Sequence, residues 1–261
     1  MEVLRLKLKT GFPSGVAWEA LEQDGQCILF SSEDEGNCEL YLKHTLFLRE
    51  YDFVDSIETM TLEDTNWELQ WEQHAPGFSD GKMHLDLKPY GFDKILILKS
   101  GPGFGDMSHA TTRLVLSMMP AEIQNRIVID IGAGSGILAI AAALFGAKEV
   151  IGIEIDSLAI DHANENAKLN QLNKEVSFFP TSQHIAFHEE QSYLIVMNMI
   201  IKEQQMAWKV MQFPKTIHGV AIVSGILEEE RESYLEIVSA WGWSLQEEVS
   251  EKGWLGLKFS F

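Results

Sequence analysis

The sequence predicts an α/β protein whose larger C-terminal part is a mostly parallel sheet with helices on both faces, preceded by a smaller α+β domain. Two observations lead to this prediction. Beyond residue 100, short apolar strand candidates alternate with helical segments, whereas short strand candidates predominate before it. Ser100–Gly105 (SGPGFG) is the strongest structure-breaking segment and separates the two patterns. We therefore expect one domain over residues 1–100 and another over residues 101–261.

The elements of the N-terminal part are short. Alternation of apolar and polar residues predicts its strands, and apolar residues at helical spacing predict its helices. The second helix follows from the spacing of Trp67, Trp71 and His74. The expected strands are Leu4–Leu8, Cys27–Phe30, Leu40–Leu48, Lys82–Lys88 and Lys94–Lys99, and the expected helices are Gly15–Leu21 and Asn66–His74.

The C-terminal part reads as strands separated by helices. Such regular alternation favours a parallel sheet, in which ligands bind beyond the carboxyl ends of the strands. The expected strands are Ile127–Ile131, Val150–Ile155, Val176–Phe179, Tyr193–Met197, Val220–Val223 and Gly253–Phe261, and the expected helices are Ile137–Phe145, Ser157–Asn170, Lys202–Met211 and Glu228–Ala240.

Composition narrows the class of protein. The chain has 261 residues, of which 46% are hydrophobic, so wholesale disorder is excluded. No apolar run reaches the length of about 18 residues that spans a bilayer, and we expect no membrane association. Two cysteines, Cys27 and Cys38, are too few for a disulfide framework, so we expect a cytoplasmic protein. His184 and His188 lack further ligands at metal-binding spacing, and no metal site is expected.

The charge is strongly acidic, because 39 acidic and 20 basic residues give a net charge of −19. Such a chain is not expected to bind nucleic acid directly. Residues 1–90 contain 18 acidic and 7 basic residues, a net of −11, and are the more acidic part per residue. This excess is typical of a solvated surface, and it also suits a docking face for a basic protein substrate.

The most informative segment is the glycine-rich turn that follows the strand at Ile127–Ile131. Gly132, Gly134 and Gly136 follow Asp130 in the order D-I-G-A-G-S-G, just before a helix. Glycines allow a sharp turn and a close approach of the backbone to a ligand. A dinucleotide-binding loop would place its third glycine one residue later, and Asp130 would repel a phosphate there. An acidic residue here favours a cationic nucleoside cofactor, S-adenosylmethionine.

A second acidic residue stands at the end of the next strand. Glu154 lies 18 residues after Gly136, near the spacing at which a carboxylate holds ribose hydroxyls. A carboxylate accepts hydrogen bonds from both hydroxyls at once. Alternatively, Glu154 is a surface acid at the end of a strand.

Four motifs follow one another in the second part of the chain. They are Gly103–Thr112 (GFGDMSHATT), Asp130–Ala142 (DIGAGSGILAIAA), Gly152–Ala159 (GIEIDSLA) and Met197–Ile200 (MNMI). In this order they resemble the motifs of the PrmA family of ribosomal protein methyltransferases. The resemblance covers residues 65–261 and fades before residue 60. It implies the Rossmann-like fold of class I methyltransferases, with a seven-stranded sheet, and an enzyme that transfers methyl groups from S-adenosylmethionine to amines of a basic, ribosomal protein.

The resemblance also implies site residues. Cofactor contacts are expected at Thr112, Gly132, Glu154 and Asn198, together with Asp130, Gly134 and Gly136 of the same glycine turn. Asn198 and His109 are the candidate catalytic residues. Asn198 is alternatively a turn residue at a strand end, and His109 alternatively satisfies local backbone groups.

Two departures from the family pattern leave alternatives open. Glu154 stands where the family has Asp, and Asp106-Met107 stand where it has Thr-Gly. The second change removes a glycine and adds a negative charge near the methyl donor. The alternatives are a methyltransferase for a different protein or a small molecule, and a non-catalytic module that binds S-adenosylmethionine. The absence of an N-P-P-Y motif at Asn198 argues against a nucleobase or a glutamine amide as the acceptor.

Overall fold

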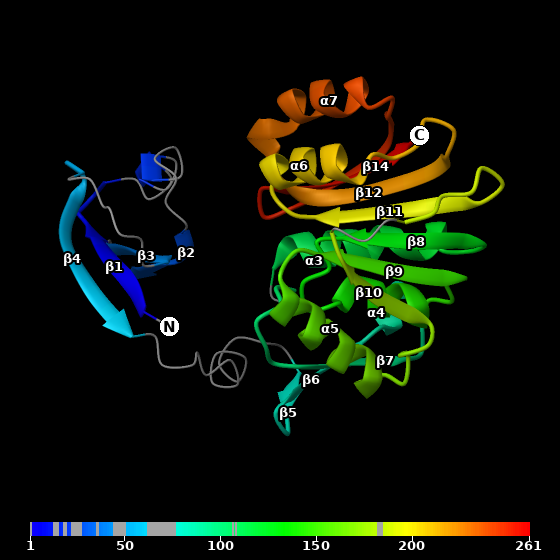
Figure 1. Cartoon of the computed structure of the whole chain (residues 1–261), viewed down its shortest axis with the longest axis horizontal. Helices are drawn as coiled ribbons and strands as arrows, with labels where there is room; N and C mark the ends of the chain where they lie inside the picture. The colour runs from blue at the N-terminus through cyan, green and yellow to red at the C-terminus, as the bar shows by residue number, and fades with distance from the viewer. Residues whose placement is uncertain are drawn as a thin grey trace. The chain divides into compact units, whose positions relative to one another are not determined.

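The computed structural model describes most of the chain, which divides into two compact units, Met1–Asn66 and Trp67–Phe261 (Figure 1). The expected helix Asn66–His74, residue Asp106 and Cys27 lie outside the described residues. The described residues are 2–12, 16–17, 20–21, 28–34, 37–43, 51–61, 77–105, 107, 109–181 and 185–261.

The first unit contains a four-stranded antiparallel sheet in the order β2-β3-β1-β4. Its strands are β1 (Glu2–Leu8), β2 (Ile28–Asp34), β3 (Asn37–Lys43) and β4 (Val54–Thr61). Leu4, Leu6 and Leu8 alternate along β1 and pack with Leu40 and Leu42 of β3, as expected for a sheet with one buried face. The sequence does not predict β4, because its apolar residues Val54, Ile57 and Met60 are three positions apart and do not alternate with polar ones.

The second unit is built on a seven-stranded sheet in the order β10-β9-β8-β11-β12-β14-β13. In the order of the sheet, neighbouring strands pair in parallel along β10, β9, β8, β11 and β12. Only β14 is antiparallel to both of its neighbours, β12 and β13, so the predicted mostly parallel sheet is confirmed. The strands are β8 (Arg126–Ile131), β9 (Glu149–Glu154), β10 (Val176–Pro180), β11 (Ser192–Asn198), β12 (His218–Leu227), β13 (Ser244–Glu251) and β14 (Trp254–Ser260).

Helices cover both faces of this sheet (Figure 1). They are α3 (Ala110–Met118), α4 (Ile137–Leu144), α5 (Ser157–Leu169), α6 (Ile201–Met211) and α7 (Arg231–Ala240), with short 3-10 turns η1 (Lys88–Tyr90), η2 (Met119–Glu122) and η3 (Glu228–Glu230). Along β8, Ile127, Ile129 and Ile131 pack on the α6 and α7 side, while Val128 packs on the side of α3, α4 and α5. Because strand side chains alternate, Asp130 lies on the same side as Val128.

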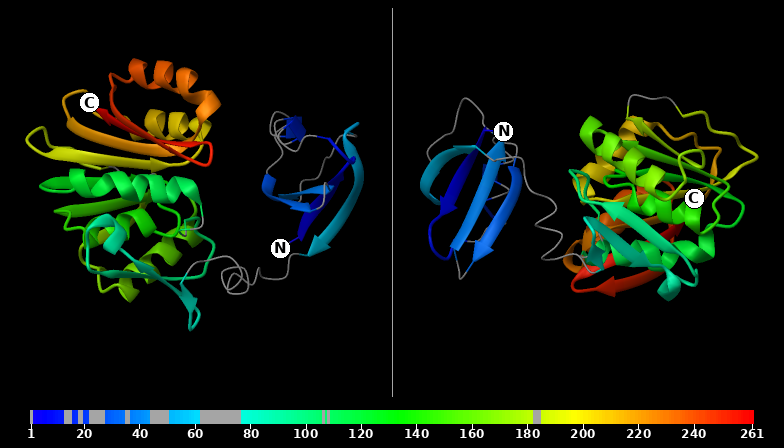
Figure 2. Two further views of the ribbon diagram at one scale, coloured as in Figure 1. Left: turned by 180° about the vertical axis from the view of Figure 1, so that it is seen from behind. Right: turned by 90° about the horizontal axis from the view of Figure 1, so that it is seen from below.

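A small antiparallel sheet in the order β5-β6-β7 belongs to the second unit. Its strands are β5 (Phe78–Ser79), β6 (Lys82–Asp86) and β7 (Ile95–Lys99), and Figure 2 shows it beside the helices on the α4 and α5 side. We expected this strand pair in the first domain, with a boundary before residue 101. The chain instead divides at Asn66, because Leu85, Leu96 and Leu98 join the core of α4 and α5.

Among the described residues, none of the helices combines the length and the apolar character that crossing a membrane requires.

Candidate functional site

The glycine turn lies between β8 and α4, as the sequence predicts. Gly132, Gly134 and Gly136 have φ values of +75°, +53° and +80°, in the left-handed region that side chains other than glycine rarely adopt. A Cβ on Gly134 would lie 2.3 Å from the carbonyl oxygen of Phe104, and one on Gly132 would lie 2.3 Å from Cε of Met199. The turn is therefore pressed between two other segments, and its backbone needs glycine.

Asp130 is buried below this turn. Its Oδ2 accepts a hydrogen bond from the backbone N–H of Ala139 in the first turns of α4, at 3.1 Å. Its Oδ1 is also buried and has no hydrogen-bond partner among the described residues. Burial raises the pKa of Asp130 to about 7, the Ala139 N–H opposes this, and the negative charge of Glu154 adds to it. A buried carboxylate with an unpaired oxygen is electrostatically suited to a cation nearby.

Glu154 ends β9 and faces the glycine turn. Its Oε2 accepts a hydrogen bond from the N–H of Gly134 at 2.9 Å, and its Oε1 accepts from the N–H groups of Ile155 and Asp156 at 2.7 and 3.1 Å. The three bonds fix the carboxylate against the turn. The glutamate side chain is longer than that of aspartate, and it reaches Gly134 from the end of the strand.

Thr112 and Asn198 meet at the carboxyl ends of the strands. Asn198 is the last residue of β11, and its Nδ2 donates to Oγ1 of Thr112 at 3.4 Å. Thr112 lies in the first turn of α3 and is completely buried. The two residues come from separate motifs, 86 positions apart in the sequence, and the fold brings them together as a pair.

His109 caps α3. Its Nδ1 accepts from the N–H of Thr111 at 3.4 Å and lies 2.8 Å from the Thr111 hydroxyl oxygen. Its ring packs edge-on against Phe104 and Trp254, with centroid distances of 6.0 and 5.2 Å. These contacts are those of a residue that shapes the start of a helix. A catalytic role of His109 stays a prediction.

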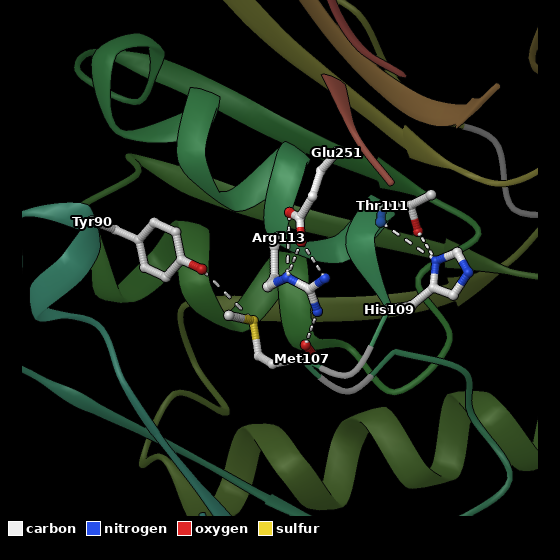
Figure 3. A network of polar contacts seen from close by, with 6 residues as sticks. All are labelled: Tyr90, Met107, His109, Thr111, Arg113 and Glu251. Atoms are coloured by element: carbon white, nitrogen blue, oxygen red, sulfur yellow. Dashed lines mark hydrogen bonds and ion pairs between the residues drawn. The ribbon is translucent and has the colours of Figure 1, made fainter. Parts of the chain in front are cut away.

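An ion pair at the start of α3 also contacts Met107 (Figure 3). Arg113 bonds Glu251 at the end of β13, with Nη2 and Oε1 2.5 Å apart, and its Nη1 donates to the carbonyl of Met107 at 2.6 Å. The hydroxyl of Tyr90 contacts the sulfur of Met107 at 4.0 Å. Arg113 holds the pKa of Glu251 below its usual range. The sequence does not predict this network, because Arg113 and Glu251 are 138 positions apart and β13 is mostly polar.

Direct contacts join all four sequence motifs. Gly134 bonds Glu154, Ser135 donates its N–H to the carbonyl of Phe104 at 2.7 Å, and Met199 covers Gly132 beside Asn198. The predicted cofactor residues therefore lie together at the carboxyl ends of the parallel strands. Asp130 is the exception, because it is buried under the glycine turn. Among the described residues, no group of three or more His, Cys, Asp or Glu side chains is arranged to hold a metal ion.

Comparison with known proteins agrees with this arrangement. A ribosomal protein L11 methyltransferase from Tolumonas auensis is 32% identical over 188 residues, which cover 69% of this chain and 63% of that protein. One from Carboxydothermus hydrogenoformans is 28% identical over 203 residues, covering 74% of this chain and 65% of that protein. A crystal structure of the ribosomal protein L11 methylase from Lactobacillus delbrueckii subsp. bulgaricus matches with a TM-score of 0.54 at 25% identity, covering 73% of this chain and 91% of that one.

The matched region thus spans somewhat less than two thirds of the two relatives in sequence. The model of one protein family, described as ribosomal protein L11 methyltransferase (PrmA), matches residues 20–261. With the predicted motifs assembled at one edge of a Rossmann-like sheet, the chain belongs to the ribosomal protein L11 methyltransferase (PrmA) family.

Proposed function

We propose that this protein is an S-adenosylmethionine-dependent protein methyltransferase that methylates amines of a basic ribosomal protein. The names of its relatives point to ribosomal protein L11 as that substrate. The observation that carries the proposal is the assembly of the four motifs by direct contacts at the carboxyl ends of the strands. The acidic excess of residues 1–90 supports recruitment of a basic protein there. A cytoplasmic location follows from such a substrate.

The residues present fit the cofactor. S-adenosylmethionine carries a sulfonium, an α-ammonium and ribose hydroxyls, and its sulfonium methyl group is what a bound cofactor supplies to the reaction. Glu154, which the Gly134 N–H fixes against the glycine turn, would accept hydrogen bonds from the ribose hydroxyls, and the buried Asp130 would contribute negative potential near the cationic groups. The glycine turn gives the backbone access to the ligand at the start of α4.

The Asn198 and Thr112 pair orients the reacting amine. The Thr112 hydroxyl accepts from the Asn198 amide, which fixes the direction of the amide oxygen. That oxygen accepts a hydrogen bond from the substrate amine and aligns its lone pair for in-line displacement. His109 sets the position of Thr112 by capping α3. Desolvation of the substrate amine on binding would lower its pKa, so that it would release its proton to solvent before transfer.

The test is transfer of labelled methyl groups. The protein is incubated with methyl-labelled S-adenosylmethionine and either a cell lysate or purified ribosomal proteins, and the labelled product is identified by mass spectrometry. We expect label on the amines of one basic ribosomal protein. Glu154→Ala should abolish labelling, whereas Glu189→Ala, at an exposed position away from the turn, should retain it.

Other outcomes contradict parts of the proposal. Label on another protein or a small molecule would overturn the substrate, and cofactor binding without any transfer would indicate a non-catalytic binding module. Failure of the wild-type protein to bind S-adenosylhomocysteine in calorimetry would overturn the cofactor site itself.

A further inference from the structure

The buried face of α5 carries three polar side chains at a spacing of four residues. They are His162, Asn166 and Asn170, the last at the C-cap of the helix. His162 is 4% exposed and Asn166 is completely buried. Buried polar groups are retained at a cost unless they are hydrogen-bonded, so their partners indicate what they do.

The two asparagines bond an edge of β7 in place of a neighbouring strand. Asn170 accepts from the N–H of Ile97 at 2.9 Å and donates to its carbonyl at 2.6 Å. Asn166 accepts from the N–H of Lys99 at 2.9 Å and donates to the carbonyl of Ser135 in the glycine turn at 2.9 Å. Alternate residues of a strand expose their N–H and C=O groups to the same edge, which is why a spacing of four residues on α5 can follow it.

His162 extends this set beyond the end of β7. Its Nε2 lies 2.9 Å from the carbonyl oxygen of Lys99, and its Nδ1 lies 3.1 Å from the backbone N of Gly103. A carbonyl can only accept and an N–H can only donate. The ring is therefore neutral, with its proton on Nε2 and its lone pair on Nδ1.

The segment that His162 holds is the loop that lies on the glycine turn. A Cβ on Gly103 would lie 2.5 Å from the carbonyl oxygen of Gly134, and the Ser135 hydroxyl donates to the carbonyl of Gly105 at 2.5 Å. A Cβ on Gly101 would lie 2.5 Å from the His162 ring. The loop is thus clamped between the histidine on one side and the glycine turn on the other.

We propose that His162 is a positioning residue that holds Gly101–Gly105 on the glycine turn, in the geometry that the cofactor needs. This inference rests on the proposed function, because it assumes that the cofactor binds beside that turn. The imidazole acts through the loop and need not touch the ligand. The loop is held in this place only while the ring is neutral, since protonated Nδ1 would present an N–H to the N–H of Gly103.

The surroundings of the ring favour that neutral form. Burial lowers the pKa of His162 from its ordinary value of 6.5, the Lys99 carbonyl opposes this, the positive charge of Lys99 adds to it, and Glu165 opposes it. Lys99 and Glu165 are themselves an ion pair, so their charges on the ring largely offset each other. Loss of the Gly103 bond by protonation is therefore confined to pH values below about 6.5.

The test compares three variants with the wild-type protein. His162→Ala removes both backbone bonds and also the contact of Nε2 with Asn166 Nδ2 at 3.2 Å. His162→Gln keeps one acceptor and one donor without a titrating group. His218→Ala is a matched control at an exposed position at the start of β12, the opposite end from the site. Affinity for S-adenosylhomocysteine is measured by calorimetry from about pH 8 to about pH 5, and hydrogen exchange of residues 101–105 is measured without ligand.

At neutral pH we expect His162→Ala to weaken binding about tenfold, His162→Gln to remain within about threefold of wild type, and His218→Ala to match wild type. Exchange of residues 101–105 should rise in His162→Ala only. Titration of Asp130 affects all variants alike, so the part of the pH dependence that is due to His162 is the difference between wild type and His162→Gln.

Three results would overturn the proposal. These are unchanged affinity in His162→Ala, failure of His162→Gln to restore affinity although thermal melting shows a folded protein, and a His162-dependent step above about pH 6.5. If the wild-type protein does not bind S-adenosylhomocysteine, the proposed function fails instead, and the exchange experiment still decides whether His162 holds the loop.

Discussion

Replacing Asp130 with asparagine should stabilise the protein while it weakens cofactor binding. The carboxylate is buried, and one of its oxygens has no partner among the described residues. Asparagine has nearly the same shape, keeps an oxygen that accepts from Ala139, and removes the buried charge. Functional sites commonly retain such unfavourable groups because the ligand needs them.

The magnitude follows from the pKa of Asp130. Burial raises the pKa of Asp130 from its ordinary value of 3.8 to about 7, and each pKa unit corresponds to about 1.36 kcal/mol. Above pH 7 the ionised carboxylate therefore lowers the free energy of unfolding by about 4 kcal/mol. The asparagine amide brings an N–H group that lacks a partner at the Oδ1 position, which costs about 2 kcal/mol. The expected net gain in unfolding free energy near pH 8 is therefore about 2 kcal/mol.

The sign of the pH dependence is equally specific. A carboxyl whose pKa is raised in the folded state binds its proton more tightly there, so the cost is full above about pH 7 and disappears as the pH falls. The advantage of Asp130→Asn should shrink by about 1 kcal/mol between pH 8 and pH 6. Urea unfolding followed by tryptophan fluorescence measures this, because six of the seven tryptophans belong to the second unit.

Two outcomes would refute this reasoning. One is an Asp130→Asn protein that is less stable than wild type near pH 8. The other is a stability difference that does not change between about pH 6 and about pH 8. Unchanged affinity for S-adenosylmethionine in the variant would leave the stability argument intact and would remove Asp130 from the cofactor site.

Three further predictions concern other contacts of the second unit. Glu154→Ala should lower the affinity for S-adenosylmethionine at least about thirtyfold in calorimetry, because it removes a carboxylate fixed by three N–H groups. Unchanged affinity would contradict the role of Glu154 in cofactor binding. Gly134→Ala should lower the free energy of unfolding by more than about 2 kcal/mol, whereas Gly242→Ala, which also has a positive φ but open space around it, should cost about 1 kcal/mol. Gln204→Leu should cost about 2–3 kcal/mol in urea unfolding, because the buried Tyr234 hydroxyl loses its acceptor, and adding Tyr234→Phe should recover part of that loss.

The central fold could be predicted from the sequence because its strands are apolar on both faces. Ile127–Ile131 and Tyr193–Met197 are read easily, since a strand covered by helices on both sides is a continuous apolar run. In contrast, β13 (Ser244–Glu251) is mostly exposed and β4 (Val54–Thr61) is polar, so neither produced a recognisable pattern. The small sheet could not be assigned to its unit, because only tertiary packing attaches Leu96 and Leu98 to α4 and α5.

The candidate site was predictable where local geometry demands a residue type. Glycines with positive φ and an acid at the end of a strand leave a signal in the sequence, and the structure brings them together. The residues that hold them in place leave no such signal in the sequence. Arg113 contacts Glu251, which is 138 positions away, and His162 contacts Gly103, which is 59 positions away. Their functions therefore depend on the folded arrangement alone. Asp130 lies under α4, because strand alternation points its side chain to that side of the sheet, and its place in the cofactor site stays a prediction.

The exposed strand β13 affects how the protein behaves in solution. It ends the seven-stranded sheet, and the unpaired backbone groups of such a border can pair with a strand from another molecule. Here Glu247 and Glu248 are paired with Lys258 and Arg231, and the pairing with β14 shifts register between Leu245 and Glu247. Charged side chains and a local distortion both oppose intermolecular strand addition. The glutamates that remove the apolar pattern of this strand from the sequence thus also oppose aggregation of the protein.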